Sequence, residues 1–336
     1  MNTKRHIFLL CSSWLIFWGS LSFAQQPWIE QVTAMTIDGY FKKAEALVNQ
    51  KIAETDSALA PCLYLASVLN SRMTHYESND QAGRFTRLLH FIINKANQQL
   101  DQPNLSDSLL ARLYFYRGSA YGYLGFFQGQ NGQWFKALKN GLKAIDDLTA
   151  CTKLDSTLYE AYLGLGTYKY WRSTKLKAVL WLPFLKDLRE EGIADIKRAM
   201  RTSSNSRYMA LHQLVYILID YKHYDEALEY SEQGIQKFPQ SQFMWWAYAH
   251  VFFKSHQYHK AIKAYSHLLK LIKSHPESNP SHWLDCQVRL AEVYKRLGQT
   301  QQAKQLARLI LKHQKDFPDT EKNRQRLAHA RELLNS

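Results

Sequence analysis

The clearest pattern in the chain is a helical recurrence of apolar and small residues in its C-terminal third. Between residues 258 and 272 these positions are spaced three and four apart: Tyr258, Ala261, Ile262, Tyr265, Leu268, Leu269 and Ile272. Such spacing places them on one face of an α-helix. The same pattern returns at Ala303, Leu306, Ala307, Ile310 and Leu311. One helix pair cannot bury a stripe of this width alone, so the pattern predicts pairs that stack on one another.

The helix pairs recur with a fixed period. Tyr224-x-x-Ala227 is followed 34 residues later by Tyr258-x-x-Ala261. Ala303 comes 42 residues after Ala261, which we interpret as one period plus an insertion near the polar segment 275–280. The clearest repeats are therefore predicted at 208–241, 242–275 and 284–317.

This period, and the residues at its fixed positions, resemble the tetratricopeptide repeat (TPR) family. The second repeat supplies Trp245, Ala249, Phe252, Tyr258 and Ala261, and the third supplies Leu290, Ala291, Tyr294, Gly298 and Ala303. Lys222 and His256 depart from the family, because they stand where it has a turn glycine. The resemblance implies an all-α, TPR-like α-solenoid that binds partners in a concave groove.

Upstream of residue 208 the period is looser, but helices are still expected. Segments 57–74 and 83–101 are expected to pair, as are the helices around 117–125 and 137–144, with Phe126–Gly132 as an extended turn between the latter two. Including a polar capping helix at 319–335, we predict about seven helix pairs in one continuous solenoid over residues 25–336.

Composition supports helix and argues against several kinds of site. The 336 residues include only 14 Gly and 8 Pro, too few for a turn-rich β-sandwich. Cys62, Cys151 and Cys286 are widely spaced and odd in number, so they indicate buried apolar side chains instead of a disulfide framework. We expect no metal site and no cofactor, since His256-x-x-His259 lacks a third ligand nearby.

The N-terminus has the layout of a secretory signal peptide. Lys4 and Arg5 precede an apolar run at 7–18, and Ser22 and Ala24 are small residues before a cleavage point. We predict a signal peptide at 1–24 and export to the periplasm or cell envelope of a bacterium. The alternative is a leader retained as a membrane anchor.

The family resemblance also implies which residues face the groove, since the first helix of each TPR pair lines it. In the order of the three clear repeats, the candidate partner-binding residues are His212, Tyr216 and Asp220; Phe243, Trp246, His250, Phe253 and Lys254; and Glu292, Lys295 and Arg296. This wall is aromatic at first and cationic toward its end. It is suited to an extended peptide with apolar side chains and an acidic group.

An insertion after residue 170 has no counterpart in the repeat. It contains Trp171, Trp181, Pro183 and Phe184 in a basic stretch. Three interpretations stay open: additional core, a lid over the groove, or a contact with a membrane surface. The net charge of +14 favours acidic partners or anionic lipid, and nucleic acid is the least favoured of these for an exported protein.

The sequence therefore predicts an exported, non-catalytic TPR scaffold that binds a protein or peptide. Two alternatives remain: a peripheral protein of anionic membranes, and an enzyme with a site lined by histidines. No catalytic residue is assigned, because the chain has no H-E-x-x-H, P-loop or G-x-S-x-G motif.

Overall fold

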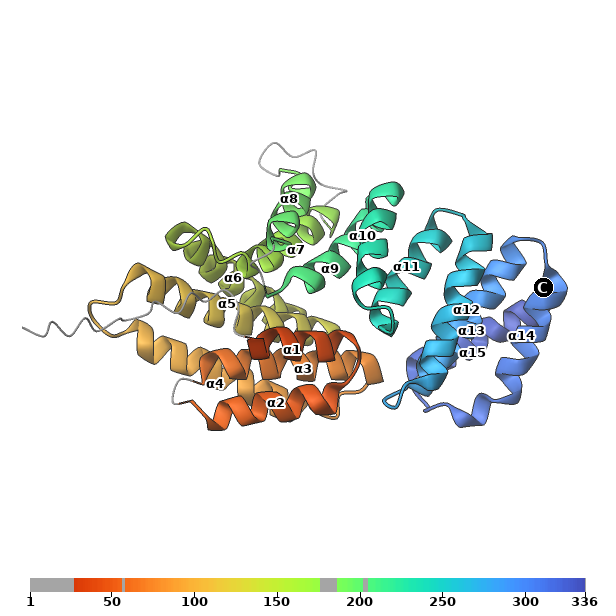
Figure 1. Cartoon of the computed structure of the whole chain (residues 1–336), viewed down its shortest axis with the longest axis horizontal. Coiled ribbons are helices and arrows are strands. Elements are labelled where there is room, and N and C mark those ends of the chain that lie inside the picture. Colours follow the sequence, from red (N-terminus) through yellow and green to blue (C-terminus); the bar gives the residue numbers. More distant parts are fainter. Residues whose placement is uncertain (1–26, 56–57, 176–185, 202–204, 336) are drawn as a thin grey trace, which may run out of the picture.

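The computed structural model describes residues 27–55, 58–175, 186–201 and 205–335. Within these ranges the chain forms fifteen α-helices, one 3-10 turn at Gln314–Asp316 and no β-strand (Figure 1). The signal peptide predicted at 1–24 lies outside the described residues. In the ranges that are described, no helix combines the length and apolar character needed to cross a membrane.

The helices follow one another as seven antiparallel pairs and a final single helix. The first four pairs are α1 Pro27–Ile37 with α2 Phe41–Ala53, α3 Leu59–Tyr76 with α4 Ala82–Leu100, α5 Asp107–Gln130 with α6 Trp134–Leu154, and α7 Glu160–Lys175 with α8 Arg189–Ala199. The rest are α9 Arg207–Asp220 with α10 Tyr224–Lys237, α11 Gln242–Lys254 with α12 Tyr258–Ser274, α13 Pro280–Arg296 with α14 Thr300–Lys312, and α15 Glu321–Asn335. The prediction of an all-α solenoid of about seven pairs with a C-terminal capping helix is confirmed.

Helices within a pair approach closely where small residues face each other. A Cβ added to Gly166 of α7 would lie 2.5 Å from the carbonyl oxygen of Gly192 in α8. A Cβ added to Gly192 would lie 2.7 Å from the carbonyl oxygen of Gly166. Gly125 of α5 similarly faces the backbone of α6 at Ala137, at 3.0 Å. These contacts require glycine because two backbones occupy the space that a side chain would need.

The turn inside most pairs ends the first helix with a left-handed residue. Gly39, Gly132 and Gly298 have φ of 83°, 74° and 74°, and Lys222 and His256 adopt the same region at 65° and 60°. In each case the next residue donates its N–H to the carbonyl five positions earlier, the bond of a Schellman cap. Lys222 and His256 therefore keep the glycine geometry, at a cost of about 1–2 kcal/mol each relative to an unstrained residue.

The turn expected at Phe126–Gly132 is shorter than predicted. Helix α5 continues through Phe126 and ends at Gln130, and only Asn131–Gln133 connect it to α6. The prediction of an extended turn was wrong because it treats Gly129 as a residue that ends the helix. Here Gly129 faces the side chain of Ala137 and Trp134 within the hairpin instead of breaking the helix.

The hydrophobic core runs along the solenoid as the repeat predicts. Apolar side chains between successive pairs form one large cluster from Val32 to Val251 and a second from Ala249 to Val293. Cys62, Cys151 and Cys286 are free thiols buried in this core, as expected from the sequence. Burial raises the pKa of Cys62 to about 11, so its thiol stays protonated.

The solenoid curves until its first pairs contact its last ones (Figure 1). Ser241 Oγ donates a 2.5 Å hydrogen bond to the carbonyl of Ile37, and Asn279 Nδ2 donates one of 2.7 Å to the carbonyl of His75. Farther out, the Arg326 guanidinium pairs with the Glu77 carboxylate at 2.7 and 2.8 Å. We call this set of contacts, between α1–α3 and the segment from α11 to α15, the closing contact.

Two neutral histidines lie inside the closing contact. The rings of His75 and His282 meet edge to face, with centroids 4.5 Å apart. Burial lowers the pKa of both, and that of His282 falls from 6.5 to about 3. The positive charges of Arg326 and Lys322 on α15 oppose protonation of His282, while Glu77 favours it. The two imidazoles are therefore uncharged at neutral pH.

A matched pair of glycine substitutions tests the close helix packing. Gly166→Ala should lower the free energy of unfolding by about 1–3 kcal/mol, because its methyl would overlap the Gly192 backbone. Gly141→Ala should instead raise it by about 0.5–1 kcal/mol, since no atom lies within 4 Å of its Cβ position. Urea denaturation measures both. Equal effects of the two substitutions would contradict the packing described for α7 and α8.

Acid should weaken the closing contact. An unfolded chain takes up protons at histidine as the pH falls through about 6.5, but the buried rings resist protonation until lower pH, so stability decreases over this range. We expect a lower urea midpoint at about pH 5 than at about pH 7. Glu77, whose pKa is lowered mainly by its hydrogen bond with Arg326 against the opposing effect of burial, adds a loss only at more acidic pH.

The histidine origin of this effect can be checked directly. His282→Gln should show a smaller change in urea midpoint between the two pH values. The exposed His259 serves as the control, because His259→Gln should keep the full change. A wild-type midpoint that is independent of pH would show that His75 and His282 are not buried as described.

Candidate binding site inside the solenoid

The odd-numbered helices carry a second stripe of residues, which faces the inside of the curve. On α3 it consists of Leu63, Ser67, Asn70 and Thr74, and on α5 of Phe115, Ser119, Gly122 and Phe126. Both stripes have steps of four, three and four residues, so each follows one helix face. Small and polar side chains on these faces leave open space where larger residues would have filled a core.

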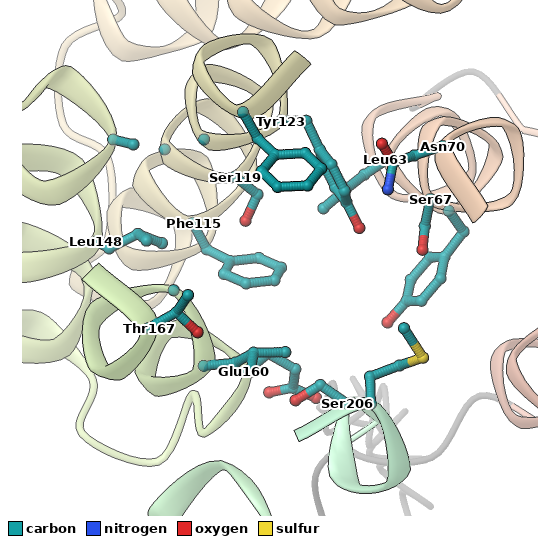
Figure 2. A pocket seen from close by; sticks show the side chains of 18 of the residues that line it. Leu63, Ser67, Asn70, Phe115, Ser119, Tyr123, Leu148, Glu160, Thr167 and Ser206 are labelled. Carbon is teal, nitrogen blue, oxygen red and sulfur yellow. The ribbon is translucent and has the colours of Figure 1, made fainter. Parts of the chain in front are cut away.

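The first cavity has a volume of about 470 Å³. Figure 2 shows side chains of α3, α5, α6 and α7, together with Ser206 just before α9, arranged around its open centre. Its walls are mainly apolar, and the glycines at 118, 122, 141 and 164 flatten the side formed by α5, α6 and α7. Volume and lining are typical of a site that buries apolar groups of a ligand.

A few polar groups interrupt the apolar wall of the first cavity. Glu160 at the start of α7 accepts hydrogen bonds from the backbone N–H of Asn205, at 2.8 Å, and from its side-chain amide, at 3.0 Å. Ser67 and Ser119 lie on facing helices, with Tyr123 beside them (Figure 2). Burial raises the pKa of Tyr123, so this phenol is a neutral donor. Ser67, Ser119 and Tyr123 can orient a ligand through neutral hydrogen-bonding groups, while the Glu160 carboxylate is held by Asn205.

A second cavity of about 400 Å³ adjoins the first. Both are lined by Thr36, Asn70, Phe126 and Met209, so the two spaces share a wall between α1, α3, α5 and α9. The second cavity extends toward the closing contact, between the first two helix pairs and the helices α9, α11 and α13. Its apolar lining is largely aromatic: Phe41, Phe126, Tyr216, Phe243 and Trp246.

His212 and His282 are two of the three histidines in the wall of the second cavity, and His75 is the third. His212 stacks on Phe243 with ring centroids 3.3 Å apart, and His282 approaches Trp246 with centroids 6.4 Å apart. Burial lowers the pKa of each to about 3. Neither ring is a useful proton acceptor for catalysis near neutral pH, because so little driving force for proton transfer remains.

Comparison with known proteins finds likeness in fold alone. No protein-family model matches the chain, and no curated protein matches its sequence. Among solved structures, PilW, described as a widely conserved type IV pilus biogenesis factor, aligns at a TM-score of 0.50 with 15% identity, over 81% of this chain and 99% of its own. A chain of the APC/C hetero-tetramer Cut9–Hcn1 aligns at 0.52 with 13% identity, over 91% of this chain and 54% of its own.

A tetratricopeptide repeat protein from Parabacteroides merdae also aligns, at a TM-score of 0.44 and 13% identity, over 90% of this chain and 97% of that one. This chain spans about half the length of the Cut9–Hcn1 chain that it matches. The repeat period, the paired helices and the alignments with PilW and the Cut9–Hcn1 chain agree. The fold is that of a TPR solenoid.

Four of the residues predicted to bind a partner come together in this TPR solenoid. His212, Tyr216, Phe243 and Trp246 all line the second cavity. The surface on which they lie is covered from the opposite side, because α1, α3 and the start of α2 form the other wall. The predicted groove surface is thus one wall of a partly enclosed cavity.

The remaining predicted residues lie away from both cavities. Asp220 accepts a 2.6 Å hydrogen bond from the hydroxyl of Tyr170. Arg296 pairs with Glu292 at 2.9 Å and covers the ring of Phe253 at 5.4 Å. His250 lies beside Phe253, and burial lowers its pKa to about 4. Lys254 and Lys295 are exposed. The cationic end of the predicted wall is therefore a surface beyond the second cavity.

The residues of the insertion are only partly described. Trp171 packs edge to face on the buried Tyr170, with centroids 5.2 Å apart, and belongs to the margin of the core. Trp181, Pro183 and Phe184 lie outside the described residues, so their predicted contact with a groove or membrane stays a prediction. Among the described residues, no group of three or more His, Cys, Asp and Glu side chains could hold a metal ion.

Sequence reasoning missed the walls that come from the first half of the chain. Asp38, Asn70, Ser119 and Glu160 were not singled out, because groove positions were transferred only onto the three clearest repeats. The signal that could have found them is the inward stripe itself, since Leu63, Ser67, Asn70 and Thr74 repeat at helical spacing with small or polar members. What the spacing could not show is that these helices close against α9 and α11.

Proposed function

We propose that this protein is an exported, non-catalytic scaffold that binds an extended polypeptide segment in its two adjoining cavities. The observation that carries the proposal is the pair of adjoining cavities, which are lined by side chains of α1, α3, α5, α6, α7, α9 and α11. The export part rests on the leader sequence, and the binding part on the cavities.

The shape and chemistry of the space fit a polypeptide. Each cavity is large enough for several side chains, and Thr36, Asn70, Phe126 and Met209 connect the two. Ser67, Asn70 and Gln213 offer hydrogen bonds at intervals along an otherwise apolar path, which suits a main chain with apolar side chains on either side. The Cut9–Hcn1 structure, which shares the fold, is an assembly of two proteins.

The geometry gives less support to an enzyme. Histidine and carboxylate do meet at the second cavity, as His212, His282 and Asp38. However, burial lowers the pKa of both imidazoles to about 3, far below the range in which a general base works, and it also lowers the pKa of His75 in the same wall. Binding without chemistry accounts for the site more simply.

A photo-crosslinking experiment tests the proposal. p-Benzoylphenylalanine placed at Tyr168, an aromatic residue that lines the first cavity, should form a covalent adduct with a polypeptide in intact cells. The same residue placed at Lys263, exposed on α12, is the matched control and should not capture that polypeptide. Mass spectrometry of the adduct should place the crosslink in an extended apolar segment.

A variant that fills the first cavity provides a second part of the crosslinking test. With the crosslinker moved to Met209, Ser119→Trp should abolish the adduct, because the indole fills the space between α3 and α5. Circular dichroism and a thermal melt establish that the variant is folded. Capture that persists in the folded variant, or equal capture from Lys263, would contradict binding inside the solenoid.

A second candidate function, association with anionic membranes, is favoured by one specific surface. Helix α6 exposes Trp134, Phe135, Leu138 and Leu142, whose exposed fractions are 71%, 92%, 61% and 48%. Lys136, Lys139 and Lys143 flank this apolar face, and residues 126–145 contain no Asp or Glu. Exposed aromatic and aliphatic side chains beside lysines are typical of a helix that lies in a membrane interface.

Vesicle flotation tests this candidate. Binding to vesicles containing phosphatidylglycerol should exceed binding to pure phosphatidylcholine, since each lysine near an anionic surface contributes about 1 kcal/mol. Phe135→Ser should abolish flotation, whereas Leu309→Ser, at an apolar residue exposed on α14, should leave it intact. Equal flotation of the Phe135 variant and the wild type would exclude α6 as the contact.

A further inference from the structure

The second cavity collects buried polar atoms that have no hydrogen-bond partner in the protein. Among the described residues eight side-chain atoms are in this situation, and four belong to residues that line this cavity: Asp38 Oδ1, His212 Nε2, Gln242 Oε1 and His282 Nδ1. Gln242 is only 6% exposed. Buried polar atoms are normally paired, so such a concentration at one cavity indicates a site that a polar group completes.

These four atoms share the ability to accept a hydrogen bond. A carboxylate oxygen and an amide oxygen can only accept. The imidazoles of His212 and His282 are neutral, and the unpartnered nitrogen of each is an acceptor in the tautomer that carries the proton on the other nitrogen. A ligand that satisfies all four must therefore donate several hydrogen bonds.

The charge of the lining is unusual for this chain. Although the protein has a net charge of +14, no Lys or Arg lines the second cavity, and Asp38 is the one carboxylate among its lining residues. Burial raises the pKa of Asp38, and the proximity of His275 opposes that rise. The ionised carboxylate therefore has no Lys or Arg beside it in the cavity lining.

Two arginines that interact electrostatically with residues of the lining, Arg289 with Tyr216 and Arg326 with His282, are already paired. Arg326 contacts both Glu77, at 2.7 Å, and Asp285, at 3.3 Å. Arg289 contacts Asp285 at 3.6 Å and Glu292 at 3.5 Å. His275 lies against Gly39, and its ring is tilted by 41° against that of Tyr40, with centroids 4.8 Å apart. None of these side chains is among those that line the cavity.

Aromatic rings provide the rest of the wall. Phe41 comes from α2, Tyr216 from α9, and Phe243 and Trp246 from α11. The negative faces of such rings attract a cation, by about 0.5–2 kcal/mol for each contact depending on how far the cation is desolvated. Aromatic faces, a carboxylate and several acceptors form an environment complementary to an organic cation.

We propose that the second cavity binds an ammonium or guanidinium group, with Asp38 as its counter-ion and with His212, Gln242 and His282 as hydrogen-bond acceptors. This inference rests on the proposed function, because the cation is taken to be a Lys or Arg side chain of the bound polypeptide. It differs from the acidic group expected from the sequence. That expectation came from Lys254, Lys295 and Arg296, which lie outside the cavity.

The test compares ligands that differ only in charge. n-Butylguanidinium and n-butylurea have nearly the same shape, but only the first is a cation. In isothermal titration calorimetry at neutral pH, we expect the guanidinium compound to bind at least about tenfold more tightly, corresponding to about 1.4 kcal/mol. If butylurea binds equally well, or if neither compound binds, the inference is overturned and the acceptors are satisfied by water.

Two variants connect the effect to the cavity. Asp38→Asn should remove the preference for the cation without lowering the melting temperature, because an uncompensated buried carboxylate is lost. Gln242→Glu should tighten cation binding, since it adds a second carboxylate at the wall. Asp225→Asn, on the exposed surface of α10, is the control and should change neither value. An unchanged preference in both cavity variants would overturn the assignment of Asp38.

A peptide arm identifies the source of the cation. Acetyl-Leu-Arg-Leu-amide should bind more tightly than the same peptide with citrulline, the neutral isostere of arginine, in place of arginine. A preference for butylguanidinium without one for the arginine peptide would show that the cation is a free small molecule and overturn the polypeptide source. Crosslinking at Tyr168, in the first cavity, is independent of Asp38. Capture there without cation binding would therefore overturn this inference and leave the proposed function standing.

Discussion

The closing contact between the first helix pairs and the last ones determines what this solenoid can do. A stack of helix pairs that curved less would have an open concave surface, and its inward side chains would face water. Here Ile37 contacts Ser241, and His75 contacts Asn279, across more than two hundred residues of sequence. This narrows a groove into partly enclosed cavities, so polar side chains that would be fully solvated in an open groove become largely buried.

Burial in turn determines the chemistry of the interior. The histidines at 212 and 282 are neutral because the cavity wall desolvates them, and the carboxyl of Asp38 is harder to ionise for the same reason. Outside the closing contact, charged residues are paired on the surface, as with Arg296 and Glu292. The protein thus combines a strongly basic exterior with an interior of acceptors and aromatic rings. A ligand that binds this interior would therefore differ in charge from one that binds the basic exterior.

Much of the fold could be predicted from the sequence because repeats encode it locally. The stripe from Tyr258 to Ile272 needs only its own spacing to specify a helix, and matching stripes specify how pairs stack. Local sequence signals predicted the turns less well, because a glycine can either form a turn or allow two helices to pack closely. Gly129 faces a partner helix instead of ending one, while Lys222 and His256 adopt the left-handed turn without being glycine. The composition of a turn does not by itself fix its geometry when packing on both sides holds the backbone in place.

The sequence by itself determined the helices, their pairing and the aromatic character of His212, Tyr216, Phe243 and Trp246 as a group, since these follow from intervals of three, four and thirty-four residues. Only the tertiary structure decided that Asp38, Asn70 and Phe126 share a cavity with them. The reason is that small rotations between successive pairs accumulate over the whole stack. No local sequence pattern encodes the total rotation, and it is this total rotation that places the first helix pair beside the sixth.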